Sequence, residues 1–219
     1  MPRMLFKKTG NAVWISHLDL MRLFQRAFKR AGLPLTHTQG FNPRPSVSIA
    51  LPLSVGTESH CELLDFDLDN AIVSNDEICR RLNQVLVSGV HVDQVYDGGR
   101  KLRDLSLMRC RVTLEYDGGV PAGAVDLISG LFAVKELIVP RKTKNGIQDQ
   151  DIIPMIHNMD IRQEGENSII LTALICCQNP TLNPAQLVAA IEMHQPELKP
   201  DHSTCCRLEL YDMNNEVFR

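Results

Sequence analysis

The sequence predicts an α+β fold of two tandem ferredoxin-like halves, each a βαββαβ unit with an antiparallel sheet. Segments with strand alternation and segments with helical periodicity follow one another in the order strand, helix, strand, strand, helix, strand. The same order recurs after the polar segment DGGRKLRD at 97–104. We therefore predict one domain over residues 1–99 and a second over residues 105–219.

The first half has the clearer pattern. Residues 3–9 predict a strand, and Ser16 with Asp19 three positions later predicts the capped start of a helix. Apolar residues recur at helical spacing up to Ala31, and Gly32 then ends the helix. The remaining expected elements are strands around 46–51, at 60–68 and at 90–98, and a helix within 74–89.

The second half repeats this order less regularly. Its expected strands lie at 107–116, near 137–143, at 168–177 and at 204–212, and its expected helices lie within 122–136 and from Asn183 onward. Pro184 suits the first position of the second helix. Residues 143–160 follow neither period, and we assign no element to them.

The composition is that of an ordinary globular protein, with 44% hydrophobic and 22% charged residues. No apolar run approaches the roughly 20 residues of a membrane span, so we expect no membrane association. The N-terminal residues contain no apolar stretch long enough for a secretory signal. Seven cysteines, an odd number at low density, indicate a reducing compartment. We expect a cytoplasmic protein.

The net charge of −3 conceals a strongly basic N-terminal segment, because residues 1–50 carry eight Lys/Arg and one acid, Asp19. Half of these cations fall on the helix predicted to begin after Ser16. They form a basic ridge opposite the apolar stripe, and its members are Arg22, Arg26, Lys29 and Arg30. No Glu interleaves with them to form ion pairs. The ridge therefore favours a polyanionic ligand, and an ordinary solvated helix face is the competing interpretation.

The loop after this helix, THTQGFNPRPS at 36–46, carries unusual backbone restriction. Pro43 and Pro45 restrict the residues before them to extended geometry. The side chains suited to phosphate and base contacts are Gln39, Phe41, Asn42 and Arg44. We expect a concave surface with Phe41 at its wall. In the competing interpretation Phe41 packs into the core, or Arg44 pairs with a carboxylate such as Asp65.

Other features indicate a binding protein more than an enzyme. Lys142 and Lys144 of RKTKNG could add a second basic contact, although such a segment is commonly a solvated turn. His17 and His37 flank the ridge and are weak candidates for acid–base catalysis on RNA. The paired cysteines at 176–177 and 205–206 are adjacent, which places neighbours on opposite strand faces. Without C-x-x-C spacing or a nucleotide-binding motif, we expect no metal and no cofactor.

The segments FKKTG, WISHLDLMRLFQRAFKRAGLP and QGFNPRPSVSIALPLSVGTES closely resemble the signature of a radical-SAM-linked bacterial family of unknown function. The resemblance implies a domain that is fused behind a cobalamin-binding radical-SAM protein or encoded beside one. This chain lacks the radical-SAM part and resembles the stand-alone form. The implied partner is a radical-SAM protein on a separate chain. The family's gene neighbourhoods, with ribonuclease and ribosomal-protein genes, imply RNA or a ribosomal component as a further partner.

Together these observations predict a non-catalytic module that binds RNA or a ribonucleoprotein and acts with a partner radical-SAM enzyme. One alternative is a metal-independent ribonuclease that uses His17 or His37. Another is a protein–protein adaptor whose basic ridge contacts an acidic partner surface. Retention of RNA without regard to its sequence would favour the first interpretation.

Overall fold

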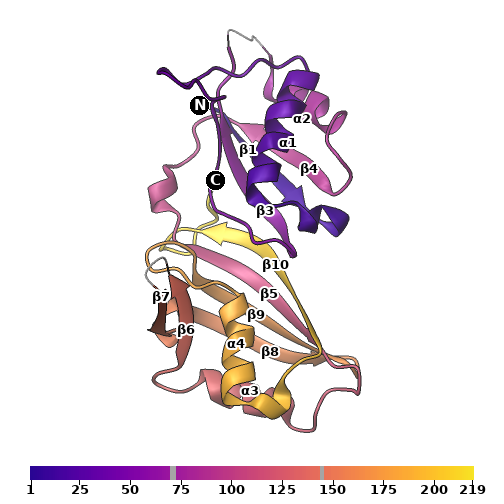
Figure 1. The fold of residues 1–219 in the computed structure, drawn as a ribbon, viewed down its shortest axis with the longest axis vertical. Coiled ribbons are helices and arrows are strands. Elements are labelled where there is room, and N and C mark those ends of the chain that lie inside the picture. The colour runs from indigo at the N-terminus through magenta and orange to yellow at the C-terminus, as the bar shows by residue number, and fades with distance from the viewer. Residues whose placement is uncertain (70–72, 144–145) are drawn as a thin grey trace. The chain divides into compact units, whose positions relative to one another are not determined.

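The computed structural model describes residues 1–69, 73–143 and 146–219, and it has a mixed α+β architecture with mostly antiparallel sheets. Four α-helices occur in this described part. The chain divides into two compact units (Figure 1), a first unit of Met1–Leu102 with Arg219 and a second unit of Arg103–Phe218. Among the described residues, no helix is both long and apolar enough to span a membrane.

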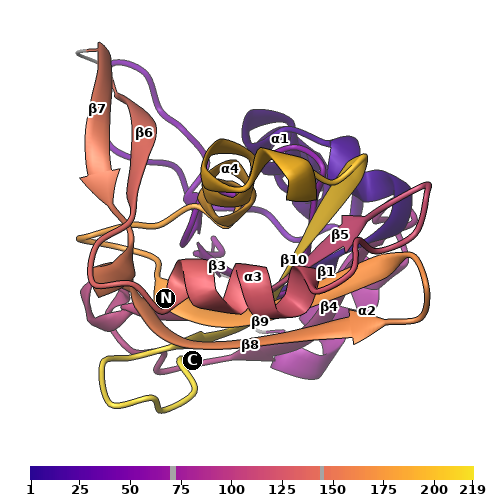
Figure 2. The ribbon, with the colours of Figure 1, turned by 90° about the horizontal axis from the view of Figure 1, so that it is seen from below.

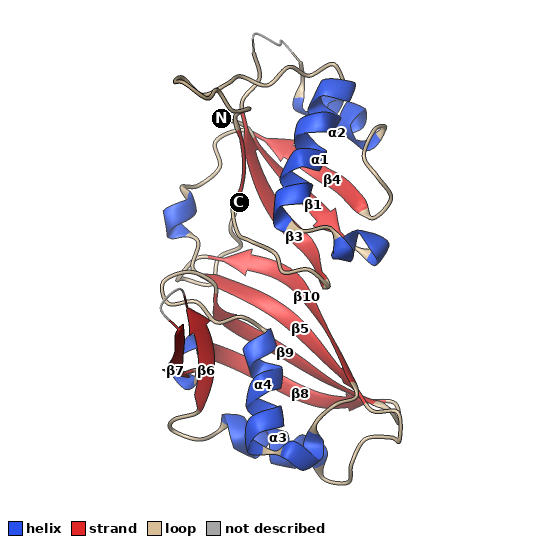
Figure 3. Cartoon of the chain, viewed as in Figure 1, coloured by secondary structure: helices blue, strands red, loops and turns tan. Residues whose placement is uncertain are grey.

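The first unit contains a sheet whose strands follow the order β4-β1-β3, with β2 paired to β3, and these pairs are antiparallel. Its two helices, α1 and α2, lie in the connections between strands (Figure 3). Its elements are β1 (Arg3–Lys8), the short 3₁₀-helix η1 (Gly10–Trp14), α1 (His17–Arg30), β2 (Val47–Ile49), β3 (Thr57–Phe66), α2 (Asn75–Asn83) and β4 (Val90–Tyr96).

Helix α1 begins and ends where its sequence predicts. The Ser16 hydroxyl accepts a hydrogen bond from the Asp19 backbone N–H at 3.2 Å, which satisfies one of the unpaired amides of the first turn. Aromatic contacts then fix the helix on the sheet, since Phe24 meets Phe6 with ring centroids 4.7 Å apart. The fully buried stripe of α1 consists of Leu20, Phe24, Ala27 and Phe28. The opposite face of α1 is consequently left to solvent.

The second unit contains an antiparallel sheet of order β10-β5-β9-β8 and a separate two-stranded hairpin of β6 and β7. Figure 2 shows this hairpin standing apart from the sheet of its own unit. The elements are β5 (Leu107–Glu115), α3 (Ala124–Phe132), β6 (Ile138–Thr143), β7 (Gly146–Asp151), β8 (Ile156–Glu164), β9 (Ser168–Cys176), α4 (Ala185–His194) and β10 (His202–Tyr211).

The middle of the second unit corrects the sequence prediction. We assigned the strand near 137–143 to the repeated unit, but among the described residues it pairs with β7 alone, and the strand beside β9 is β8. Residues 143–160, which were assigned no element, contain β7 and most of β8. Both strands have mostly exposed side chains, so neither shows the apolar alternation that marks a half-buried strand.

Candidate nucleic-acid interface

Helix α1 presents the basic ridge on its exposed face, and all four ridge cations are exposed. At about 100° of helical rotation per residue, Arg22, Arg26 and Lys29 fall within about 60° of one another. Arg30 lies further round the helix toward α2, where its guanidinium donates a hydrogen bond to the Val85 carbonyl at 2.9 Å. The structure thus brings three ridge cations together on one helix face and directs the fourth toward the end of α2.

The ridge contains one internal ion pair that the sequence interpretation missed. The Asp19 carboxylate accepts a hydrogen bond from the Ser16 hydroxyl at 2.8 Å and one from the Arg22 guanidinium at 2.9 Å. These two hydrogen bonds, with Ser16 the larger influence, lower the pKa of Asp19. Arg26 and Lys29 form no hydrogen bond or ion pair with the residues that the structure describes. They are the ridge members available to an external anion.

The loop at 36–46 folds back on itself as a short hairpin, which we call the 36–46 hairpin. The Thr38 amide donates to the Arg44 carbonyl at 2.9 Å, and the Arg44 amide donates to the Thr38 hydroxyl at 3.0 Å. The Ser46 amide donates to the Thr36 carbonyl at 2.8 Å, and the Thr36 amide bonds to the Asp67 carbonyl beyond the end of β3. The stem therefore pairs its own backbone hydrogen-bonding groups and is anchored to the sheet.

The tip of this hairpin corrects the expectation for Phe41. Its side chain is fully exposed, with a relative accessibility of 106%, so it neither lines a concave wall nor packs into the core. The stem hydrogen bonds hold the tip away from the sheet, which explains this exposure. Gln39, Asn42 and Arg44 are exposed as well. The alternative pairing of Arg44 with Asp65 is also wrong, because Asp65 accepts two hydrogen bonds from Arg3.

The two histidine candidates lie at opposite ends of α1. His17 is its first residue, and His37 belongs to the hairpin stem that is anchored beyond the far end of β3. The 14 residues of α1 span about 21 Å. Among the described residues, the buried Nδ1 atom of His17 has no hydrogen-bond partner. The structure does not bring these imidazoles together for acid–base work on one bond.

The remaining candidates add little to this interface. Lys142 lies on β6, but the position of its side chain and the whole of Lys144 lie outside the described residues. The seven cysteines are free thiols, and burial raises the pKa of Cys177 and of Cys205 to about 12. Such thiols remain protonated at neutral pH, which makes them poor nucleophiles and poor metal ligands.

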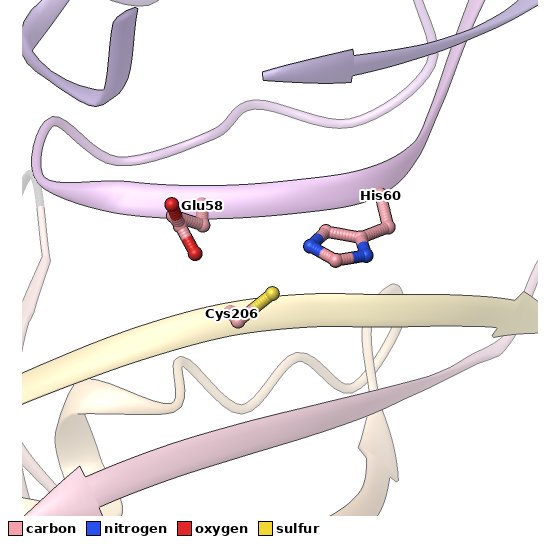
Figure 4. A group of neighbouring side chains, drawn as sticks. All are labelled: Glu58, His60 and Cys206. Carbon is pink, nitrogen blue, oxygen red and sulfur yellow. The ribbon is translucent and has the colours of Figure 1, made fainter. Parts of the chain in front are cut away.

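Metal-ligating side chains do not gather within either unit. Figure 4 shows Glu58 and His60 on β3 of the first unit and Cys206 on β10 of the second. The two β3 residues are two positions apart and offer two ligand atoms, fewer than the four of a structural zinc site. Within the described part of each unit taken separately, no three ligating side chains form a group.

Trp14 is a surface residue that the sequence analysis did not single out. It ends η1, and its side chain is 70% exposed. Leu18, in the first turn of α1, is 67% exposed and shares the ridge face of the helix. The sequence signal that could have identified this residue is a tryptophan two positions before Ser16, the N-cap of α1. The ring of Trp14 lies near Gly56, which is distant in the sequence.

The fold and this surface define a mixed α+β protein with a cationic helix face and exposed aromatic side chains beside it. The chain belongs to the family described as an uncharacterized protein conserved in bacteria, DUF2344, whose model matches residues 2–184. No curated protein matches the sequence.

Three solved structures match this chain at low sequence identity. One is a chain of the crystal structure of a Cbf5-Nop10-Gar1 complex, with a TM-score of 0.52 and 7% identity, covering 95% of this chain and 48% of that one. A chain of the archaeal box H/ACA sRNP Nop10-Cbf5 complex gives 0.48 and 8%, covering 94% and 46%. An unknown protein from Galdieria sulphuraria gives 0.26 and 11%, covering 97% of each chain. This protein spans about half the length of the first two chains.

Proposed function

We propose that this protein is a non-catalytic module that binds RNA or a ribonucleoprotein through the first unit. The observation that carries the proposal is the exposed pair Arg26 and Lys29, which have no hydrogen bond or ion pair among the described residues. Neighbouring cations that form no internal hydrogen bond or ion pair attract polyanions, and a phosphodiester backbone supplies regularly spaced negative charges. The exposed hairpin tip adds a guanidinium, two amides and an aromatic ring, which suit phosphates and bases.

Both units are proposed to be ferredoxin-like. The support is the strand order, since β4-β1-β3-β2 and β10-β5-β9-β8 each place the fourth sheet strand beside the first, followed by the third and second. Each unit also has one helix between its first and second sheet strands and another between its third and fourth. In this arrangement the β6–β7 hairpin is an insertion that precedes the second sheet strand.

The proposed partner is a radical-SAM protein on a separate chain in the cytoplasm. Support comes from the family resemblance of the segment WISHLDLMRLFQRAFKRAGLP, which forms α1 and its flanks. This segment contains both the ridge and Trp14, so the resemblance includes the exposed residues of the proposed interface as well as the buried stripe of α1. The module would hold an RNA or ribonucleoprotein substrate for the partner's chemistry.

The two alternative functions are less well supported. A metal-independent ribonuclease needs an acid and a base close to one phosphate, whereas His17 and His37 lie at opposite ends of α1. A protein–protein adaptor would use the same cations against carboxylates. Its binding to an acidic protein would not require RNA, which the following experiment tests.

The test removes the two unpartnered cations with Arg26→Gln/Lys29→Gln. Glutamine has a helix propensity close to those of Arg and Lys, so α1 should remain folded. Fluorescence anisotropy would measure binding of a labelled oligouridine of about ten nucleotides over a series of salt concentrations. Each lost phosphate contact should reduce the slope of log K against log salt by about 0.7, so the variant should lose about 1.4.

The matched control is Lys135→Gln/Lys199→Gln, which changes the net charge equally through two exposed lysines of the second unit. This control should retain the wild-type slope. Equal affinities and slopes for the ridge variant and the wild type, with unchanged melting temperatures, would contradict the proposal. Absence of RNA binding by the wild type would contradict it as well and would favour the adaptor function.

A further inference from the structure

Trp14 is held in place by the backbone around it. The Val13 carbonyl accepts a hydrogen bond from the Lys8 ammonium at 3.0 Å and another from the Gly56 amide at 2.9 Å. The indole lies against Gly56, since a Cβ atom added there would be 3.6 Å from Cζ3 of Trp14. The Cζ3 edge of the ring therefore lies near the Gly56 backbone, while the residue as a whole is 70% exposed. This geometry is that of a fixed aromatic platform.

The exposure of Trp14 is notable because its neighbours are also exposed and apolar. A buried tryptophan removes on the order of 150–250 Å² from water, and this one gives up most of that stabilisation. Single exposed apolar side chains are common on protein surfaces and need no partner. Here, however, Leu18 is 67% exposed and Val55, beside Gly56, is 54% exposed. The apolar surface at the start of α1 is thus larger than one side chain.

The cations and the exposed aromatic side chains follow one another in the chain from η1 through α1 to the 36–46 hairpin. Leu18, Arg22, Arg26 and Lys29 fall within about 80° of helical rotation, so they share one exposed face. Trp14 lies before the first residue of α1, and Phe41 lies in the hairpin beyond its last. The order in the chain is therefore an exposed aromatic ring, the cations from Arg22 to Lys29 over about 10 Å of helix, and a second exposed aromatic ring.

This order fits an unpaired strand better than a duplex. A single strand can place its phosphates beside cations while its unstacked bases lie flat on aromatic rings. In an A-form duplex the base faces are stacked on one another, and the protein meets only backbone and base edges. An acidic protein would satisfy the cations, but carboxylates are not aromatic and do not stack on an indole as bases do.

We infer that the ligand of this surface is single-stranded RNA whose backbone follows α1 and whose bases stack on Trp14 at one end and on Phe41 at the other. This inference rests on the proposed function and specifies its ligand. Trp14 contributes binding energy without contacting a phosphate. Its removal should therefore weaken binding without changing the salt dependence, in contrast to removal of the ridge cations.

The chain contains one tryptophan, so its intrinsic fluorescence reports on Trp14 alone. Titration with an oligouridine of about ten nucleotides should quench this fluorescence with the same midpoint as the anisotropy of a labelled copy. A duplex RNA of equal length should bind more weakly and quench little. Trp14→Ala should weaken single-strand binding about tenfold or more, with an unchanged salt slope, and Trp14→Phe should restore most of the affinity.

Met193→Ala is the matched control, because Met193 is a similarly exposed apolar residue (57%) on α4 of the second unit. It should bind like the wild type. Binding detected by anisotropy without a fluorescence change, or wild-type affinity of Trp14→Ala, would overturn the inference and leave the proposed function intact. Equal binding of duplex and single strand would overturn it in the same way. If the wild type binds neither RNA, the proposed function itself fails.

Discussion

The buried ion pair between Arg3 and Asp65 should control the stability of the first unit. Asp65 accepts hydrogen bonds from Arg3 Nε at 2.5 Å and from Arg3 Nη2 at 3.0 Å, and the Arg3 side chain is only 5% exposed. Gly99 packs on the guanidinium, since a Cβ atom there would be 2.9 Å from Cζ of Arg3. The pair links β1 to β3, and Arg3 also donates to the Arg100 carbonyl. Breaking it leaves a guanidinium in a site with little access to water.

We predict that Asp65→Leu lowers the free energy of unfolding by about 3 kcal/mol. Removing one member of a buried pair costs roughly 3–5 kcal/mol, and the lower end applies because the Asp65 side chain is 21% exposed. Arg3→Leu/Asp65→Leu removes both charges and should cost about 1 kcal/mol or less, since apolar replacements of buried pairs are often neutral. The double variant should therefore be more stable than Asp65→Leu alone.

Urea unfolding followed by circular dichroism and by Trp14 fluorescence would measure these differences, because Trp14 belongs to the first unit. A double-mutant cycle with Arg3→Leu then gives the coupling energy between the two side chains. A cost below about 1 kcal/mol for Asp65→Leu, or a double variant less stable than both single variants, would refute this account of the pair.

Three further results are expected. Ser16→Ala removes the hydroxyl that caps α1 through the Asp19 amide, and the free energy of unfolding, measured by thermal unfolding, should fall by about 1 kcal/mol. An unchanged melting temperature would mean that the cap is dispensable. Hydrogen bonds from two arginines of α2 lower the pKa of Glu77 to about 2. The ionised carboxylate therefore stabilises the fold at pH values above the ordinary pKa of 4.5, and this stabilisation is lost as the pH falls toward 2. NMR titration would measure the pKa, and a value near 4.5 would contradict these contacts. Gly89→Ala places a Cβ atom 2.3 Å from the Thr9 carbonyl oxygen, at a residue whose φ is +86°, and it should therefore be strongly destabilising. Soluble expression with a native melting curve would show that the turn can rearrange.

The sequence predicts the first unit well because several local signals agree there. The cap at Ser16, the apolar stripe and the terminating Gly32 together place α1 within one residue of its observed bounds. Strand β8 was missed because it lies at the end of the strand order and exposes most of its side chains. Its identity as a strand depends on pairing with β9, which no local pattern in its own sequence reports.

The candidate site was predictable only where helical geometry determines exposure. The spacing of Arg26 and Lys29 places them opposite the buried stripe, and both are exposed in the structure. The exposure of Phe41 depends on the register of the hairpin stem, which the two prolines alone do not determine. The surroundings of Trp14 include Gly56, which is more than 40 positions away in the sequence. Sequence reasoning identifies cations on a helix more readily than aromatic side chains in irregular segments.

The self-contained stem of the 36–46 hairpin makes folding of this segment independent of the side chains at its tip. Hydrogen bonds between Thr36 and Ser46 and between Thr38 and Arg44 hold the stem through backbone atoms and one hydroxyl. The side chains between them carry no packing that the core requires, as the fully exposed Phe41 shows. Substitutions at the tip should therefore cost little stability. The same property makes the tip a suitable position for a fluorophore or an affinity tag.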